Sequence, residues 1–313
     1  AGVGAGFHDE EYAEAGATVA DQKEAWSKEF IVKAKELQHW EFDRPHKGQI
    51  FMNFQLMGIS PPRLEAAQRS GAIFLANENI RFPDGRRPLL EPMSRISGRM
   101  AATIGSTLLQ KYKGGSGVFM TPVAGCPPGQ GLVVGAGVAG QEAALGLLEM
   151  GAVVTLRSRG QAGLDRAYEY MPERLRHNLT IKRIDEPGFE DDVINSDLLI
   201  GAVSVPGMET PKLISRELIG RRREGSAYVE VGVDQGGISE TCHMRYFSDP
   251  MYIEEGQVHF CVSNLPAAFP RASTFALVEA SLPYVRHIAE RGVKEACEAC
   301  PELMNGLVVG SLH

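Results

Sequence analysis

The spacing of apolar and polar residues changes repeatedly along this chain between the period of a helix and that of a buried strand. Helical spacing is found at 10–15, 21–26 and 61–70, and short apolar runs at 30–32, 50–54 and 72–75. Because helices and buried strands follow one another in turn, this part of the chain predicts an α/β structure with a mostly parallel sheet.

From Leu132 onward the same alternation becomes regular. Strands are predicted at 132–134, 153–157, 180–183, 197–202 and 227–233, and helices at 138–150 and 189–195. This order predicts a Rossmann-type doubly wound parallel sheet. A long helix at 94–111, with Ser94 as its N-cap, is expected before the sheet, and another at 273–290 after it.

The two long helices separate two expected domains. We expect a dinucleotide-binding Rossmann domain at 90–264 and a second α/β domain, for the substrate and the catalytic groups, formed by 1–89 and 265–313. The length of 313 residues is sufficient for two domains of ordinary size.

Composition narrows the possible partners and compartments. The chain is 43% hydrophobic and 23% charged, as in globular proteins, and its net charge of −7 gives no support to nucleic-acid binding. No apolar run is long enough to cross a bilayer, and five cysteines, an odd number, favour reduced thiols in a cytoplasmic protein. Cys297 and Cys300 lie in a helical pattern, which favours packing over a metal site.

A glycine-rich run between a predicted strand and a predicted helix carries the first sign of function. It has the pattern Gly-x-Gly-x-x-Gly directly after the apolar strand 132–134. In such a loop the first glycine permits a tight turn, the second lets the backbone approach a pyrophosphate, and the third lets the helix pack closely on the strand. The first N–H groups of the helix hold the phosphates. The candidate cofactor-binding residues here are Gly135, Gly137, Val138, Ala139 and Gly140.

The end of the next strand indicates which dinucleotide is bound. A site for NAD(H) has an Asp or Glu there that accepts hydrogen bonds from the ribose 2′-hydroxyl. This chain has Arg157, Ser158 and Arg159 instead. Serine can donate to a phosphate oxygen, and arginine forms charge-assisted, often bidentate bonds to it. These residues predict a preference for NADP(H), with an unselective site that also takes NAD(H) as the alternative if both arginines point to solvent.

Four further runs of sequence stand out. They are Pro88–Met100, Val229–Gly237, Ser263–Pro266 and Pro270–Thr274. Together they resemble the alanine dehydrogenase and transhydrogenase family, over nearly the whole chain, and the Asp-Gln-Gly-Gly sequence in the second run favours the dehydrogenase branch. The resemblance implies two domains, interconversion of alanine with pyruvate and ammonia, and a homo-oligomer, often a hexamer.

The same resemblance implies roles for individual residues. Lys35 matches the active-site lysine that holds the oxo-acid substrate, and Asp234 matches the active-site aspartate, which can stabilise an iminium or relay a proton. Ser158 occupies the position of the family's ribose-binding aspartate. A surface position for Lys35 and a turn-forming role for Asp234 remain the alternatives. Besides the loop glycines, cofactor contacts are implied at Ser94, Ala202, Val203, Val262, Asn264 and Leu265.

Two departures distinguish this chain from the family. Counted without a gap from Lys35, the family's active-site histidine falls at Leu56, with Gln55 and Asn53 as the nearest polar residues. The family also has an N-terminal segment before the point where this chain begins, and that segment carries an arginine that binds the substrate carboxylate. Because loss of a general acid or base costs about 10²–10⁴-fold in rate, ordinary alanine dehydrogenation is not expected.

We therefore expect NADP(H)-dependent hydride transfer to an imine or a 2-oxo acid. A preformed imine needs less acid–base chemistry than one assembled from a ketone and ammonia, and Asp234 or Lys35 could supply its proton beside an apolar wall at Leu56. Two alternatives remain: a cofactor-binding sensor or regulatory subunit with degenerate chemistry, and amine cyclisation or deamination that recycles the cofactor.

Overall fold

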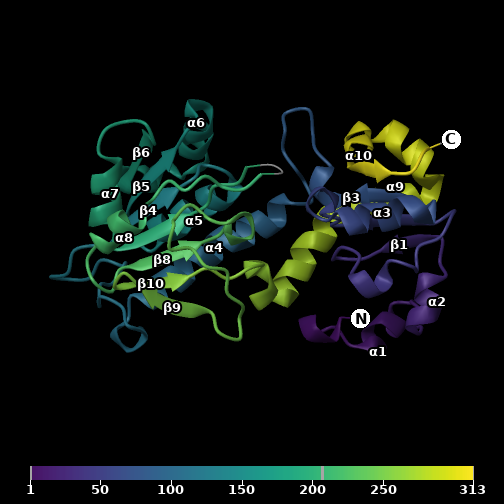
Figure 1. Ribbon diagram of the computed structural model, residues 1–313, viewed down its shortest axis with the longest axis horizontal. Coiled ribbons are helices and arrows are strands. Elements are labelled where there is room, and N and C mark those ends of the chain that lie inside the picture. Colours follow the sequence, from purple (N-terminus) through teal and green to yellow (C-terminus); the bar gives the residue numbers. More distant parts are fainter. Residues whose placement is uncertain (1, 206–207, 313) are drawn as a thin grey trace. The chain divides into compact units, whose positions relative to one another are not determined.

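The computed structural model describes residues 2–205 and 208–312, which form two compact units (Figure 1). One unit comprises residues 1–93 and 269–313, and the other comprises residues 94–268. The sequence predicts these divisions at 89/90 and 264/265. The chain passes from one unit to the other within α4 (Glu91–Leu108) and again just before α9 (Pro270–Ala299).

The first unit is built on a four-stranded sheet with the order β1-β2-β3-β11. Its parallel strands are β1 (Phe30–Val32), β2 (Ile50–Asn53) and β3 (Ile73–Ala76), and β11 (Leu307–Val309) is antiparallel to β3. Its helices are α1 (Asp9–Glu14), α2 (Gln22–Trp26), α3 (Pro61–Ser70), α9 and α10 (Pro301–Gly306).

Strand β2 is apolar at consecutive positions because both of its faces are covered. Met52 packs in a cluster with Tyr284 and Ile288 of α9. Phe51 points to the other face, where its ring stacks on that of Phe74 with 4.7 Å between the centroids.

The second unit is built on a seven-stranded sheet with the order β6-β5-β4-β7-β8-β10-β9. The first six in this order are parallel, and only β9 is antiparallel to its neighbour. These strands are β4 (Gln130–Val134), β5 (Val153–Ser158), β6 (Leu179–Arg183), β7 (Leu198–Gly201), β8 (Ala227–Glu230), β9 (Met251–Glu254) and β10 (Gln257–Phe260). The helices beside α4 are α5 (Val138–Glu149), α6 (Gln161–Tyr170), α7 (Phe189–Asn195) and α8 (Arg216–Gly220).

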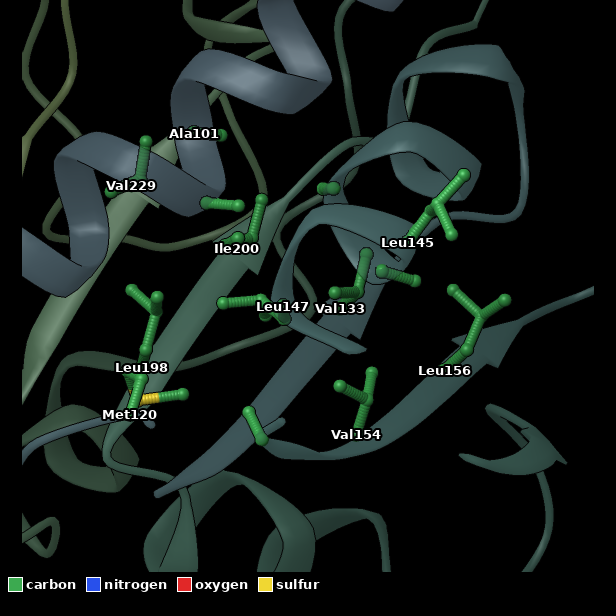
Figure 2. Packing of buried hydrophobic residues seen from close by; sticks show 14 of the residues in the cluster. Ala101, Met120, Val133, Leu145, Leu147, Val154, Leu156, Leu198, Ile200 and Val229 are labelled. Carbon is green, nitrogen blue, oxygen red and sulfur yellow. The ribbon is translucent and has the colours of Figure 1, made fainter. Parts of the chain in front are cut away.

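Apolar side chains cover both faces of the central strands of this sheet. Val133 of β4 packs with Val154 of β5 and Leu147 of α5 on one face (Figure 2). Leu132 and Val134, which alternate with Val133, pack on the other face against α7 and α8. The predicted fold class, a Rossmann-type parallel sheet with a second α/β domain, is confirmed. No helix in the described part of the chain combines the length and the hydropathy needed to cross a membrane.

Two predicted elements have different limits in the structure. Helix α4 begins at Glu91, so Ser94 lies inside its first turns and is not its N-cap. Pro92 is compatible with this earlier start because a proline in the first turn of a helix leaves no hydrogen bond unmade. Strand β8 ends at Glu230 instead of at 233, since the chain turns directly after that residue.

Candidate cofactor and active site

The glycine loop lies between β4 and α5. Strands β5 and β6 lie on one side of β4, and β7 and β8 lie on the other, so the strand order reverses between β4 and β7. Open α/β sheets bind ligands at this point, outside the carboxyl ends of the strands. Gly135 has φ +116°, and a Cβ there would lie 2.4 Å from the carbonyl oxygen of Ala202. A Cβ on Gly140 would lie 1.7 Å from the carbonyl oxygen of Gly135. Both positions therefore require glycine for the loop to fold at all.

Gly137 differs from the other two loop glycines. A Cβ built on it meets nothing within 4 Å, and the residue is exposed. It is the N-cap of α5, with no side chain capping the helix in the described part of the chain. The first N–H groups of α5, at Val138 and Ala139, have no backbone partner among the described residues, and a helix terminus of this kind favours an anion. A dinucleotide phosphate fits this position in both charge and space.

Helix α4 packs against the first turn of α5. A Cβ on Gly98 would lie 2.2 Å from the carbonyl oxygen of Ala139, so the two backbones approach closely at this point. Arg99 fixes the contact by donating from Nε to the buried carboxylate of Glu142 over 2.6 Å. Ser94 lies one turn before Gly98 on α4 and is half-buried, so its helix places it on the side of the glycine loop.

The other predicted cofactor contacts follow two further strands of this sheet, β7 and β10, at the same edge. Ala202 and Val203 follow β7, and both are half-buried. Val262 and Leu265 follow β10 and are buried, whereas Asn264 between them is exposed and has φ +55°, a conformation that asparagine adopts more readily than most residues. The structure thus places these residues at the carboxyl edge of the sheet that carries the glycine loop, with Ala202 and Val203 next to Gly135. Their contacts with a cofactor remain a prediction.

Asp234 is exposed in the short turn that follows β8. Its Oδ1 accepts a hydrogen bond from the hydroxyl of Ser263 over 2.5 Å. Ser263 belongs to the segment that leads from β10 to the predicted contacts above, so the structure joins the candidate catalytic carboxylate to the cofactor side of this unit. Sequence reasoning included Ser263 in a motif but assigned it no role.

A buried carboxylate that the sequence reasoning missed holds the turn of Asp234 in place. Glu230 has no exposed surface, and its carboxylate accepts from the N–H groups of Gly232, over 2.8 Å, and Ile238, over 2.9 Å, and from the hydroxyl of Tyr228. Burial raises the pKa of Glu230, and these three donors act in the opposite direction. An acidic residue at the end of the apolar strand β8 was the available signal, because a carboxylate enters a core only with partners.

Arg157 does not have the predicted role of a phosphate ligand. Its side chain has no exposed surface, because it turns away from the cofactor edge toward α7 and the loop after β6. Nε and Nη2 bind the carboxylate of Asp192 over 2.7 and 2.6 Å. The remaining donors bind the carbonyl oxygens of Arg183, Glu186 and Pro187 over 2.5 to 3.1 Å. All five N–H groups are therefore used inside the protein, and none is available to a ligand.

Ser158 and Arg159 are in a different situation from Arg157. Ser158 is half-buried at the last position of β5, and Arg159 is exposed just beyond it. Within the described residues, neither the Ser158 hydroxyl nor the Arg159 guanidinium has a side-chain or backbone partner. The backbone nearby is tied to the glycine loop, since the N–H of Gly135 donates to the carbonyl of Arg157 over 2.7 Å. A cofactor bound on the loop therefore extends toward two unused polar groups.

Lys35 and Leu56 belong to the first unit. Lys35 is exposed after β1, and its carbonyl accepts from Nδ2 of the buried Asn53 over 2.8 Å. Leu56 has φ +48°, and its side chain is 41% exposed. Glu78 accepts the N–H of Leu56 over 2.6 Å, and Nη1 of Arg63 donates to its carbonyl over 3.1 Å. Side chains of neighbouring residues thus hold this backbone in place, and the Leu56 side chain itself points outward.

The cysteine pair at the end of the last long helix lies against other residues of the first unit. Cys297 of α9 is buried in a core cluster with Ile288 and Leu303, and Sγ of Cys300 lies 3.4 Å from Nδ1 of His287. Among the described residues, no group of three or more possible metal ligands comes together.

Comparison with known proteins places this geometry in a family. The model of the alanine dehydrogenase/PNT N-terminal domain matches residues 1–97, and that of the C-terminal domain matches residues 101–311. An alanine dehydrogenase from Staphylococcus haemolyticus is 36% identical over 98% of this chain and 82% of its own length. One from Halomonas elongata is 38% identical over 95% of this chain and 79% of its own length.

Solved structures agree with these sequence matches. An L-alanine dehydrogenase superimposes with a TM-score of 0.90 at 37% identity, covering 98% of this chain and 84% of that one. A transhydrogenase from Sinorhizobium meliloti shares the fold, with a TM-score of 0.83 at 17% identity over 99% of this chain and 88% of that one. The family resemblance expected from the sequence motifs is confirmed, and the chain belongs to the alanine dehydrogenase/PNT family of oxidoreductases.

Proposed function

We propose that this chain transfers hydride between NADP(H) and the carbon of a C–N or C–O double bond, with an imine or a 2-oxo acid as the oxidised substrate. Membership of the alanine dehydrogenase/PNT family supports nicotinamide-dependent oxidoreduction. The observation that carries the finer proposal is Leu56, an exposed apolar side chain at the position implied for the family's histidine.

The choice of cofactor is supported by the end of β5. A carboxylate there would repel a 2′-phosphate, whereas Ser158 and Arg159 offer a hydroxyl and a guanidinium without partners among the described residues. Arg157 no longer supports this choice, because its guanidinium is fully used inside the protein. The preference for NADP(H) over NAD(H) therefore depends on residues other than Arg157.

The residues of each unit have separate parts in the proposed chemistry. A bound nicotinamide supplies or accepts the hydride. Asp234, at the carboxyl edge of the sheet, stabilises a positively charged iminium and holds or moves its proton, with Ser263 orienting one carboxylate oxygen. Lys35 provides a cation for a substrate carboxylate. Leu56 offers an apolar contact and no proton, which favours substrates whose C=N bond is already formed.

Replacement of Asp234 tests whether the chain is an enzyme or a sensor with degenerate chemistry. Asp234→Asn keeps the shape of the side chain but removes its charge, so we expect turnover of NADPH with cyclic and acyclic imines to fall by about 10²–10⁴-fold. Cofactor affinity, measured by NADPH fluorescence, is expected to remain unchanged. Asp43→Asn, at a fully exposed position of the first unit, is the matched control.

Two outcomes contradict this proposal. If no imine or 2-oxo acid with ammonia oxidises NADPH in the presence of the protein, a sensor or regulatory subunit is the better description. If product forms without net consumption of NADPH, the reaction is instead a cyclisation or deamination with recycled cofactor. We also propose a homo-oligomer, as expected from the family; an exposed apolar stripe on α9, formed by Phe275, Val278 and Leu282, supports it.

A further inference from the structure

Arg183 lies beside Ser158 on the neighbouring strand. The register of β5 and β6 pairs Ser158 with Arg183 and Arg157 with Lys182. Residues that are paired directly across neighbouring strands point to the same face of a sheet, and successive residues point to opposite faces. Ser158 and Arg183 therefore share one face, and Arg157 points to the other. Ser158 and Arg183 are the last residues of β5 and β6, at the edge where a sheet of this kind binds ligands.

Arg157 determines where the backbone of Arg183 lies. Its Nη1 donates to the carbonyl oxygens of Arg183 and Glu186, and its Nη2 donates to that of Pro187. The N–H of Ile184 also donates to the carbonyl of Ser158 over 3.0 Å. The loop after β6 is thus bound to β5 on both sides of Arg183, which keeps this residue next to Ser158.

The guanidinium of Arg183 is only partly used. Nε donates to Asp185 over 2.8 Å and Nη2 forms an ion pair with the same carboxylate, while Nη1 has no partner within the described residues. The side chains of Arg183 and Asp185 are 44% and 65% exposed. Ion pairs at such exposure contribute little to stability, so a doubly charged phosphate can compete for this guanidinium.

We propose that Arg183 is a specificity residue for the 2′-phosphate of NADP(H), acting with Ser158 and Arg159. Ser158 donates its hydroxyl, and the two guanidinium groups approach the phosphate from β6 and from the start of α6. This inference rests on the cofactor choice in the proposed function and adds a second guanidinium, beside that of Arg159, in place of Arg157.

Asp185 opposes the same ligand. Its carboxylate holds Arg183 when no phosphate is present and repels a phosphate that approaches. Removing the charge of Asp185 is therefore expected to act in the opposite direction from removing that of Arg183. A pair of variants with opposite effects distinguishes a phosphate site from a general loss of structure.

The 2′-phosphate can be tested apart from the rest of the cofactor. Calorimetric titration with 2′,5′-ADP and with 5′-AMP measures the ratio of the two Kd values, which isolates the contribution of that phosphate. For Arg183→Met we expect the preference for 2′,5′-ADP to fall by about tenfold or more, because one charge-assisted contact is lost. Binding of 5′-AMP should stay unchanged, which also shows that the variant is folded. For Asp185→Asn we expect the preference to rise.

Arg174→Met is the matched control. Arg174 is an exposed arginine that precedes β6, at the opposite edge of the sheet, and its removal changes the net charge equally. If the unmodified protein prefers 2′,5′-ADP and Arg183→Met keeps that preference, the role of Arg183 is wrong while the cofactor choice stands. If the unmodified protein binds 5′-AMP as tightly as 2′,5′-ADP, the choice of NADP(H) itself is wrong.

Discussion

At the scale of single residues, Leu56 shows a mismatch between side chain and backbone. Its φ of +48° lies in the left-handed region, which leucine rarely adopts and which histidine, asparagine and aspartate adopt several times more often. The carboxylate of Glu78 accepts the N–H groups of both Gln55 and Leu56 and so imposes this conformation. The backbone at position 56 therefore suits the residue that the family resemblance implies better than the residue that is present.

Replacing Leu56 with histidine is expected to be tolerated and to change the chemistry. The side chain is 41% exposed, so little apolar burial is lost, and the free energy of unfolding should change by less than about 1 kcal/mol. The new imidazole adds a general acid or base, so we expect Leu56→His to raise the rate of reductive amination of 2-oxo acids relative to reduction of preformed imines. Leu56→Gln, which has no titrating group, is the control. Equal rate ratios in both variants would contradict this role for position 56.

At the scale of secondary-structure elements, the apolar strands and the amphipathic helix α3 were predictable to within one or two residues. The predicted limits of β1 and α3 agree with the structure, and those of β2 and β4 differ by one or two residues. The hairpin of β9 and β10 was missed, although its turn at Glu255 and Gly256 has positive φ at both positions and two alternating runs beside it. The polar residues Gln257 and His259 interrupt β10 although all four of its residues are buried, and such alternation is a weaker signal than a continuous apolar run.

The direction of a side chain at a strand end was less predictable than the strand itself. Arg157, Ser158 and Arg159 were interpreted as one group, yet a strand sends successive side chains to opposite faces. The structure buries Arg157 and leaves the other two accessible. The partner of Ser158 on its own face is 25 positions later in the chain, and only the register of β5 and β6 reveals it.

Arg157 connects three elements, and its removal should destabilise the fold. Arg157→Met leaves the carboxylate of Asp192 with only Lys182, 3.7 Å away, as a cation, and leaves the carbonyl oxygens of Glu186 and Pro187 without this donor. We therefore expect a loss of about 3 kcal/mol in the free energy of unfolding. Arg159→Met removes an exposed arginine two residues away and should change it by less than about 0.5 kcal/mol. Urea denaturation of the two variants measures the difference, and equal stabilities would show that Arg157 is not the structural residue inferred here.

At the scale of the whole molecule, motifs distributed along the chain predicted the family correctly. They lie over the start of α4, around the end of β8, after β10 and in the first turns of α9. The buried polar residues that hold the second unit together were not predictable in the same way. Arg157, Glu230 and His259 are each buried, and each has a partner outside its own strand, 35, 8 and 18 positions away respectively. The protonation of such residues makes the free energy of unfolding depend on pH.

His259 makes folding of the second unit dependent on pH. Burial lowers its pKa to about 4, from an ordinary value near 6.5, and its ring nitrogens lie 2.8 Å from the Thr241 hydroxyl and 3.0 Å from the carbonyl of Gln257. The unfolded chain therefore binds a proton on this residue at a higher pH than the folded chain does. The contribution of His259 to the free energy of unfolding is fully present above pH 6.5, where the residue is neutral in both states. It is lost as the pH falls toward 4. The loss amounts to about 3 kcal/mol at most.

Thermal or urea unfolding between pH 7 and pH 4 measures this dependence. His259→Gln is expected to give a flatter profile over that range, and His177→Gln, an exposed position, is expected to leave the profile unchanged. A profile that is equally steep in both variants would assign the dependence to other groups.

The three glycines of the cofactor loop are needed for different reasons. Without Gly135 and Gly140 the chain would collide with itself, since their missing side chains make room for carbonyl oxygens of the protein. The missing side chain of Gly137 makes room for nothing in the chain. A descendant that abandoned its nucleotide could therefore replace Gly137 with alanine and keep its fold, whereas the other two would persist. In a relative of this protein, a glycine at the middle position therefore indicates that the loop still binds a nucleotide. Glycines at the outer two positions indicate only that the loop has kept its fold.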